Sequence, residues 1–105
     1  MAKQLPVIRS AKAQADVEDA LGYYLFEAPH VASRFLDSLE RAVAHIQRSP
    51  GTGSQRYAIE LDMPGLRFWS LNKFPFALFY LEQSDHLLVL RLVHMSRDIP
   101  ATLLP

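Results

Sequence analysis

The amino-acid sequence predicts a single α+β domain with an N-terminal strand, a hairpin of two helices and then an antiparallel β-meander. In the first half of the chain, apolar residues recur at spacings of three, four and seven, which is typical of helices. In the second half, short apolar runs are separated by turn residues, which is typical of strands. A length of 105 residues corresponds to one domain with one core. We therefore assign one domain to residues 1–105.

The chain is expected to begin with a strand at residues 5–9, followed directly by a helix over residues 11–27. Pro6 suits the start or the edge of a strand, because proline donates no hydrogen bond to a neighbouring strand. Ser10 is a preferred N-cap residue. Gly22 lies inside the helix and weakens it by about 1 kcal/mol relative to alanine. The apolar stripe of this helix consists of Ala13, Val17, Ala20, Leu21, Tyr24 and Leu25.

A second amphipathic helix is expected from Pro29 to about Arg48, because proline is well tolerated in the first helical turn. Its apolar stripe consists of Val31, Phe35, Leu39, Ala42, Val43 and Ile46. Two helices joined by so short a link form an antiparallel hairpin. Residues 49–54 contain one proline and two glycines, so we predict a loop there.

The second half of the chain is expected to form strands at residues 57–61, 66–72, 76–82 and 87–94. Met63-Pro64-Gly65 has the order of a type II turn, and residues 83–86 form a hairpin loop. The last two strands lack clean alternation, which is typical of strands buried on both faces. The helices would cover one face of the sheet, and in so small a protein a partner chain would often cover the other. The tail at residues 96–105 is expected to form one helical turn or irregular coil.

Composition and charge exclude several classes of protein. Half of the residues are hydrophobic and the formal net charge is zero, which excludes a disordered chain. Balanced charge argues against strong non-specific binding of nucleic acid. Cysteine is absent, so disulfides and thiol chemistry are excluded. No apolar run approaches the roughly 20 residues of a membrane span, and Met1–Pro6 lacks the core of a signal peptide. We expect a cytoplasmic protein without a membrane partner.

A search for catalytic motifs finds no metal, nucleotide or nucleophile signature, so we predict no metal site and no cofactor. His30, His45 and His86 fall at expected turns or on the polar side of the second helix, where solvated histidines are common. His94 differs, since it closes a buried strand and precedes Arg97 and Asp98. The alternative is a His94 that bonds a backbone carbonyl, beside a weak surface ion pair of Arg97 and Asp98.

We predict a polar, cationic cluster at one end of the sheet that binds a partner. Its cations suit an acidic segment or phosphate, although they would also pair with acidic residues of the strands and helices. An exposed sheet face bearing Phe68, Phe76, Leu78 and Tyr80 would accept an amphipathic helix or an added strand, unless these side chains fill the core under the hairpin. The residues expected to contact a partner are Arg67, Trp69, Lys73, Arg91, His94 and Arg97.

Short motifs follow one another in a particular order along nearly the whole chain. The first helix carries Ala13-x-x-Asp16-Val17 and Tyr23-Tyr24, and the second carries Ala32-x-x-Phe35-x-x-x-Leu39 before Ser49-Pro50-x-x-Gly53. The strands carry Gly65-Leu66-Arg67, Phe74-x-Phe76-Ala77-Leu78-Phe79-Tyr80 and Leu90-Arg91-Leu92-Val93-His94-x-x-Arg97-Asp98. In this order the motifs resemble the ParE branch of the ParE/RelE toxin superfamily, the plasmid stabilisation proteins of bacterial type II toxin–antitoxin systems.

The resemblance implies a small antiparallel sheet that carries an N-terminal helical hairpin. It also implies a toxin that a cognate antitoxin neutralises. ParE-like members inhibit DNA gyrase without catalysis, whereas RelE-like relatives are ribosome-dependent mRNA endonucleases. A homodimer and a toxin–antitoxin hetero-oligomer are both compatible with the sequence.

Particular residues favour the gyrase-inhibiting branch. The resemblance implies that members of the nuclease branch have an arginine at the position of Ala77 in this chain. It also implies that they have basic strand residues at the positions of Phe68 and Ser70. RNA cleavage without a metal needs cations and a proton-transfer pair, and a nuclease would have only Arg67, His94 and Arg97 for these roles. We therefore predict no catalytic residues. The endonuclease, and an inactive homologue that acts only as a binding partner, remain the alternatives.

Overall fold

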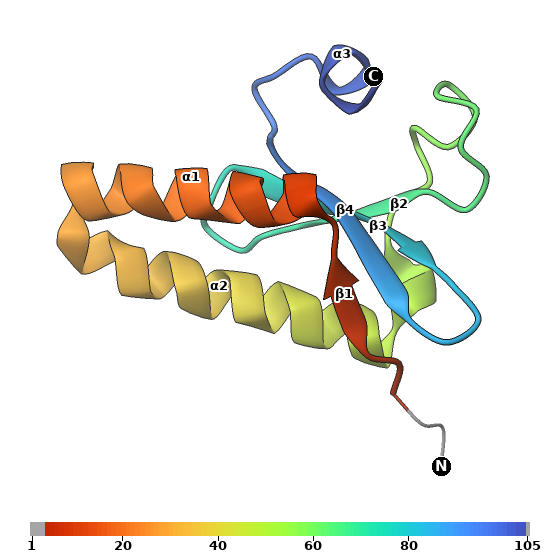
Figure 1. Cartoon of the computed structure of the whole chain (residues 1–105), viewed down its shortest axis with the longest axis horizontal. Helices are drawn as coiled ribbons and strands as arrows, with labels where there is room; N and C mark the ends of the chain where they lie inside the picture. The colour runs from red at the N-terminus through yellow and green to blue at the C-terminus, as the bar shows by residue number, and fades with distance from the viewer. Residues whose placement is uncertain (1–3, 105) are drawn as a thin grey trace.

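The fold is that of a computed structural model, which describes residues 4–104. The elements follow the chain as β1 (Val7–Arg9), α1 (Ala11–Glu27), α2 (Pro29–Arg48), the 3-10 turn η1 (Pro50–Thr52), β2 (Arg67–Ser70), β3 (Phe76–Glu82), β4 (Leu87–His94) and α3 (Ile99–Leu103). One four-stranded sheet has the order β1-β4-β3-β2, with the helical hairpin to one side (Figure 1). The α+β prediction is confirmed. Residues 1–3 and 105 lie outside the described residues. The predictions for the ends of the domain, the N-terminal segment and the tail therefore stay untested at these four positions.

The sheet is mixed, which corrects the purely antiparallel sheet implied by the resemblance. β2, β3 and β4 form the predicted antiparallel meander, but β1 pairs with β4 in parallel. β1 is a short edge strand, as Pro6 indicated, and it begins at Val7 rather than at residue 5. β2 is also shorter than predicted, at four residues.

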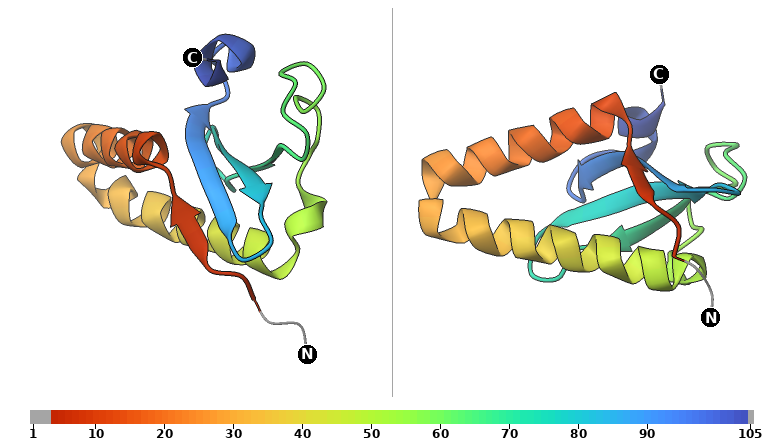
Figure 2. Two further views of the ribbon diagram at one scale, coloured as in Figure 1. Left: turned by 45° about the vertical axis from the view of Figure 1, so that its right-hand side comes forward. Right: turned by 60° about the horizontal axis from the view of Figure 1, so that its bottom comes forward.

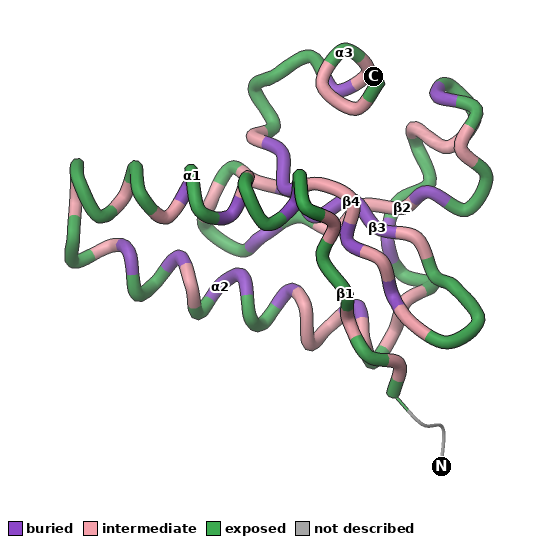
Figure 3. The backbone as a smooth tube through the Cα atoms, viewed as in Figure 1, coloured by how far each residue is buried: buried purple, intermediate pink, exposed green. Residues whose placement is uncertain are grey.

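The helical hairpin covers one face of the sheet and forms the larger core. The side chain of Ser10 caps α1 by accepting a hydrogen bond from the backbone N–H of Ala13 at 3.0 Å, and Pro29 opens α2. Leu25 is an exception to the predicted stripe, because it is 54% exposed near the free end of the hairpin, which extends beyond the sheet (Figure 3). The main buried contacts join Ala13, Val17, Phe35, Leu39 and Ile46 of the helices to Leu78, Tyr80 and Val89 of the sheet.

The strand predicted at residues 57–61 is wrong, since this segment forms consecutive turns. The N–H of Leu61 donates to the carbonyl of Tyr57 at 3.0 Å, and the N–H of Met63 donates to the carbonyl of Ala58 at 2.9 Å. Its apolar residues pack onto the sheet instead of pairing with it. The predicted type II turn is consistent with the structure, because Leu66 N–H bonds the carbonyl of Met63 and Gly65 has a φ of 85°.

The second face of the sheet is covered by the chain itself, which corrects the expectation of a partner chain there. Residues 55–66 and α3 lie over this face, opposite the hairpin (Figure 2). Phe68 points to this side, whereas Phe76, Leu78 and Tyr80 contribute to the core under the hairpin. The second core consists of Leu61, Leu66, Ala77, Phe79, Val93 and Ile99. The tail takes the helical alternative, as α3.

Candidate functional site

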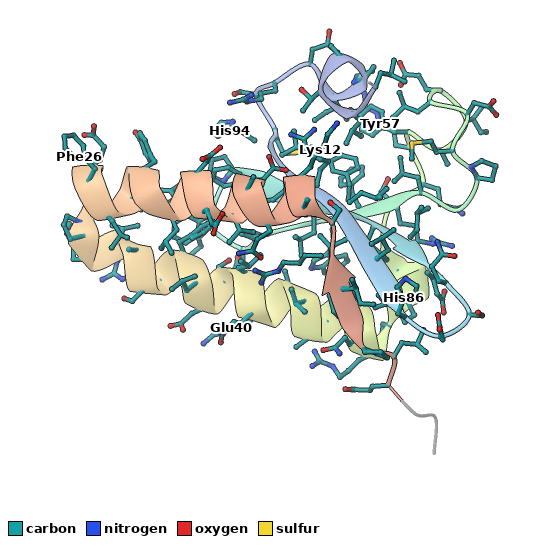
Figure 4. All side chains as sticks on the ribbon, viewed as in Figure 1. Lys12, Phe26, Glu40, Tyr57, His86 and His94 are labelled. Atoms are coloured by element: carbon teal, nitrogen blue, oxygen red, sulfur yellow. The ribbon has the colours of Figure 1, made fainter. Side chains whose placement is uncertain are left out.

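A groove of about 770 Å³ lies between α1, the end of β4 and the segment that leads into α3. Figure 4 shows His94 in this region, beside α1 and the chain leading to α3. We call it the α1–β4 groove. The polar side chains that line it belong to Asp16, Asp19, Tyr23, Tyr24, Arg91, His94, Ser96, Arg97 and Thr102.

Arg91 joins three elements at the floor of the groove. Its Nε donates to Oδ2 of Asp16 at 2.7 Å, and its Nη2 donates to Oδ1 of the same carboxylate at 3.0 Å. Its Nη1 donates to the backbone carbonyl of Thr102 in α3 at 3.0 Å. The hydrogen bonds to Asp16 raise the pKa of Arg91 above its ordinary value. Arg91 therefore pairs with an acid of the helices, one of the alternatives left open by the sequence.

Asp16 has a second role, at the edge of β4. Beyond the three residues paired with β1, no strand among residues 4–104 neighbours this edge, and Asp16 Oδ2 accepts a hydrogen bond from the N–H of Leu92 at 3.0 Å. One carboxylate thus bonds both the guanidinium of Arg91 and the backbone of β4. These contacts fix the position of α1 relative to the sheet.

His94 lies at the mouth of the groove. Its Nδ1 accepts hydrogen bonds from the backbone N–H of Ser96 at 3.1 Å and contacts the hydroxyl of Ser96 at 2.7 Å. In the neutral ring the proton is therefore on Nε2. The alternative from the sequence was a His94 that bonds a backbone carbonyl, beside an ion pair of Arg97 and Asp98. Instead, the ring of His94 accepts a hydrogen bond from the N–H of Ser96. Asp98 caps α3 by accepting a hydrogen bond from the N–H of Ala101 at 3.1 Å.

Arg67 lies at the opposite end of the sheet, away from this groove. In the strand register Arg67 pairs with Tyr80, whereas His94 pairs with Phe76. Four residues along β3 and two strand spacings place them roughly 16 Å apart. The Nη1 of Arg67 donates to the carbonyl of Gly53 at 2.8 Å. The predicted cluster is therefore divided: Arg91, His94 and Arg97 line one groove, and Arg67 does not.

Trp69 and Lys73 are also outside the groove. The indole of Trp69 stacks on the imidazole of His45, with ring centroids 3.8 Å apart and planes 14° from parallel. His45 Nε2 also lies 2.8 Å from the hydroxyl of Thr52, so His45, which is partly exposed, has two specific contacts in addition to solvent. Lys73 is exposed in the turn between β2 and β3 and has a φ of 66°.

The acids and the tyrosine of α1 in the groove were not among the residues predicted to bind. Asp16, Asp19 and Tyr23 lie on the helix face that meets the end of β4. The sequence does contain one indication of an acidic residue in this groove, namely Arg91 between Leu90 and Leu92. A partly buried guanidinium needs a carboxylate partner. The sequence does not show which of eleven acids supplies it.

Within the part of the chain that the structure describes, no group of three His, Asp or Glu side chains is placed to hold a metal ion. In the same residues, no helix combines the length and the apolar character needed to cross a membrane.

Comparisons with known proteins agree with this architecture. A family model described as "ParE toxin of type II toxin-antitoxin system, parDE" matches residues 7–99. A solved structure described as "Chromosomal ParDE TA system from P. aeruginosa" has a TM-score of 0.70 and 21% sequence identity, and the match covers 87% of this chain and 96% of that chain. At this identity the likeness shows a shared fold. Curated proteins give no match.

Proposed function

Since the chain belongs to the ParE toxin family of type II toxin–antitoxin systems, we propose that it inhibits DNA gyrase and that a cognate antitoxin neutralises it. The observation that carries the proposal is the family match, which extends from β1 to the first residue of α3. We propose the cytoplasm as its location, since gyrase acts on the chromosome there.

The arrangement of cations supports a binding toxin rather than a nuclease. A nuclease would have to bring Arg67, His94 and Arg97 to one scissile phosphate. Arg67 instead bonds the carbonyl of Gly53, at the far end of the sheet from His94. Ala77, at the position of the expected nuclease arginine, is fully buried.

Exposed apolar side chains at the free end of the hairpin support a role in protein binding. Tyr23 is 61% exposed and Phe26 is 86% exposed, and both belong to the last turns of α1. Figure 4 shows Phe26 at the end of the hairpin farthest from β1. Apolar groups gathered at such a projection are typical of interaction surfaces.

A supercoiling assay with purified protein and gyrase tests the proposal. We expect inhibition by the toxin, and recovery of supercoiling when the antitoxin encoded by the adjacent reading frame is added. Full supercoiling at a molar excess of toxin would contradict gyrase inhibition.

Primer extension on translated messages is the matched test of the endonuclease, and a protein that neither cuts RNA nor arrests growth would be an inactive homologue. Light scattering of the free toxin and of the complex distinguishes a homodimer from a hetero-oligomer.

A further inference from the structure

The free end of α1 has an outward face that belongs to neither hydrophobic core. Among residues 4–104, three of the seven exposed large apolar side chains fall within four consecutive residues, namely Tyr23, Leu25 and Phe26. Tyr23 lines the α1–β4 groove, whereas Leu25 and Phe26 do not. Leu25 and Phe26 are also absent from both buried clusters. These two side chains therefore form a surface separate from the site described above.

Gly22 lies one turn before Leu25 and Phe26 on the same exposed face of α1. Side chains of a helix lean back over the preceding turn, so Leu25 and Phe26 border the position of Gly22. Apart from the adjoining helix backbone and the two neighbours in sequence, a Cβ at Gly22 would meet no atom within 4 Å. Glycine weakens a helix, and packing within the described chain gives no reason for it here. We call this open position, with Leu25 and Phe26 at its border, the α1 notch.

The charge of α1 around the notch is negative. Residues 16–27 of α1 include no cation and four acids, which are Asp16, Glu18, Asp19 and Glu27. Asp16 is paired with Arg91, whereas the other three acids have no cation within 4.0 Å among the described residues. Glu18 is exposed and lies one turn before Gly22. A complementary partner would present an apolar side chain to the notch and cations around it.

We propose that the toxin contacts gyrase through the α1 notch, and that gyrase presents to it an apolar side chain bordered by cations. The inference rests on the proposed function, which supplies gyrase as the target. An enzyme that acts on DNA needs cationic surface for the phosphates, and such a surface complements the acids of α1. A second copy of this chain is a poorer occupant, because the acids of the two copies would face each other. The hairpin extends beyond the sheet, so its end reaches a recess that the body of the toxin does not enter (Figure 3).

Truncation of Phe26 tests the apolar part of this contact. Phe26→Ala should raise the toxin concentration that half-inhibits gyrase supercoiling by about tenfold or more, as loss of an aromatic anchor in an interface does. Ile59→Ala is the matched control, because Ile59 is 93% exposed and belongs to residues 55–66, on the side of the sheet opposite the hairpin. The control should change that concentration by less than about twofold. Equal inhibition by the two variants would overturn the proposal.

A substitution of Gly22 separates binding from folding. Gly22→Gln places a side chain at the notch and favours the helix, so we expect a higher unfolding temperature together with about tenfold weaker inhibition. Ala15→Gln is the matched control, because Ala15 is exposed two turns earlier on the same helix. A lower unfolding temperature of Gly22→Gln would show a structural role of the glycine and overturn the notch as a binding surface. Inhibition by Gly22→Gln as strong as that by Ala15→Gln would overturn it as well.

A charge reversal tests the cationic character of the partner. Glu18→Lys should bind purified gyrase about fivefold more weakly than the unaltered toxin, and the loss should shrink at high salt. Glu40→Lys is the matched control, because Glu40 is an exposed acid near the middle of α2, away from the free end of the hairpin (Figure 4). Equal effects of the two reversals would overturn the assignment of a cationic partner surface.

The outcomes distinguish this inference from the proposed function. If the unaltered toxin leaves gyrase active, the proposed function is contradicted and the inference falls with it. If the unaltered toxin inhibits gyrase and Phe26→Ala inhibits it equally, only the inference is overturned. The same variants are tested for binding of the antitoxin encoded by the adjacent reading frame, and we expect unchanged affinity. Weaker antitoxin binding with unchanged gyrase inhibition would assign the notch to the antitoxin and overturn the proposal.

Discussion

The two ends of the sheet use similar residues in different ways. At the end near η1, Arg67 donates to the carbonyl of Gly53, and the hydroxyl of Tyr80 donates to the carbonyl of Pro50 at 2.6 Å. At the other end, Arg97 lines the α1–β4 groove, and no acidic partner for it is found among the described residues. A cation near a sheet end therefore indicates a binding site only where its partner is not already supplied by the chain.

Arg91 shows that this distinction applies within the groove itself. It lines the same cavity as Arg97, but its donors are bonded to Asp16 and to α3. Its side chain is 21% exposed, and that of Asp16 is 16% exposed. We therefore assign Arg91 mainly to the packing of α1 and α3 on β4, whereas a role of Arg97 in recognition is a proposal.

The largest effect is expected from Arg91→Ala. Removing this guanidinium leaves the carboxylate of Asp16 partly buried without its counter-charge, which costs about 3 kcal/mol of the free energy of unfolding. Arg97→Ala is the control and should change that free energy by less than about 0.5 kcal/mol. Urea unfolding of both variants measures the difference. Equal stabilities would contradict a structural role that distinguishes Arg91 from Arg97.

A smaller loss of stability is expected from Gly53→Ala, at the end of the sheet near η1. A Cβ at Gly53 would lie 2.3 Å from the hydroxyl oxygen of Tyr80 and 3.0 Å from Cβ of Arg67. The clash should lower the free energy of unfolding by about 2 kcal/mol, as overpacking typically does. Gly51→Ala is the matched control, two residues away, because a Cβ there meets no atom within 4 Å. If Gly53→Ala were as stable as Gly51→Ala, the end of the sheet near η1 would not be tightly packed.

The smallest effect concerns Tyr80 and pH. Burial raises the pKa of Tyr80 above its ordinary value of 10.0. The unfolded phenol then ionises at a lower pH than the folded one, so this contribution to stability is present below pH 10.0 and is lost as the pH rises above it. Tyr80→Phe should cost about 1 kcal/mol at neutral pH, from the lost bond to Pro50, and should flatten the alkaline decrease.

Thermal unfolding of both proteins between neutral and alkaline pH measures this prediction. The comparison is needed because burial also raises the pKa of Tyr24, which remains in the variant. Parallel pH profiles for the two proteins would contradict a role for Tyr80.

Much of the fold and part of the site were predictable from the sequence. The bounds of α1, α2, β3 and β4 agree with the prediction, because each depends on local periodicity and on capping residues such as Ser10 and Pro29. Of the predicted cluster, His94 and Arg97 are close in sequence and also share the groove. Grouping Arg67 with them failed because it required knowledge of strand order and register.

Residues 55–66 show the same limit. Their apolar pattern indicates burial, but it does not show whether a segment is buried by pairing or by packing across a sheet face. The chain makes turns there and places Leu61 and Leu66 on the second face, so it covers by itself a surface expected to need a partner.

The sequence by itself determined the α+β class, the helical hairpin and the meander, since neighbouring residues set helix and strand propensity. The tertiary structure alone decided the parallel pairing of β1 with β4 and the hydrogen bond that Arg91 donates to Asp16, 75 residues away. It also decided which part of the outer edge of β4 has no strand beside it within residues 4–104. These features depend on contacts between distant segments, and such contacts are fixed only when the helices and the sheet pack into one core.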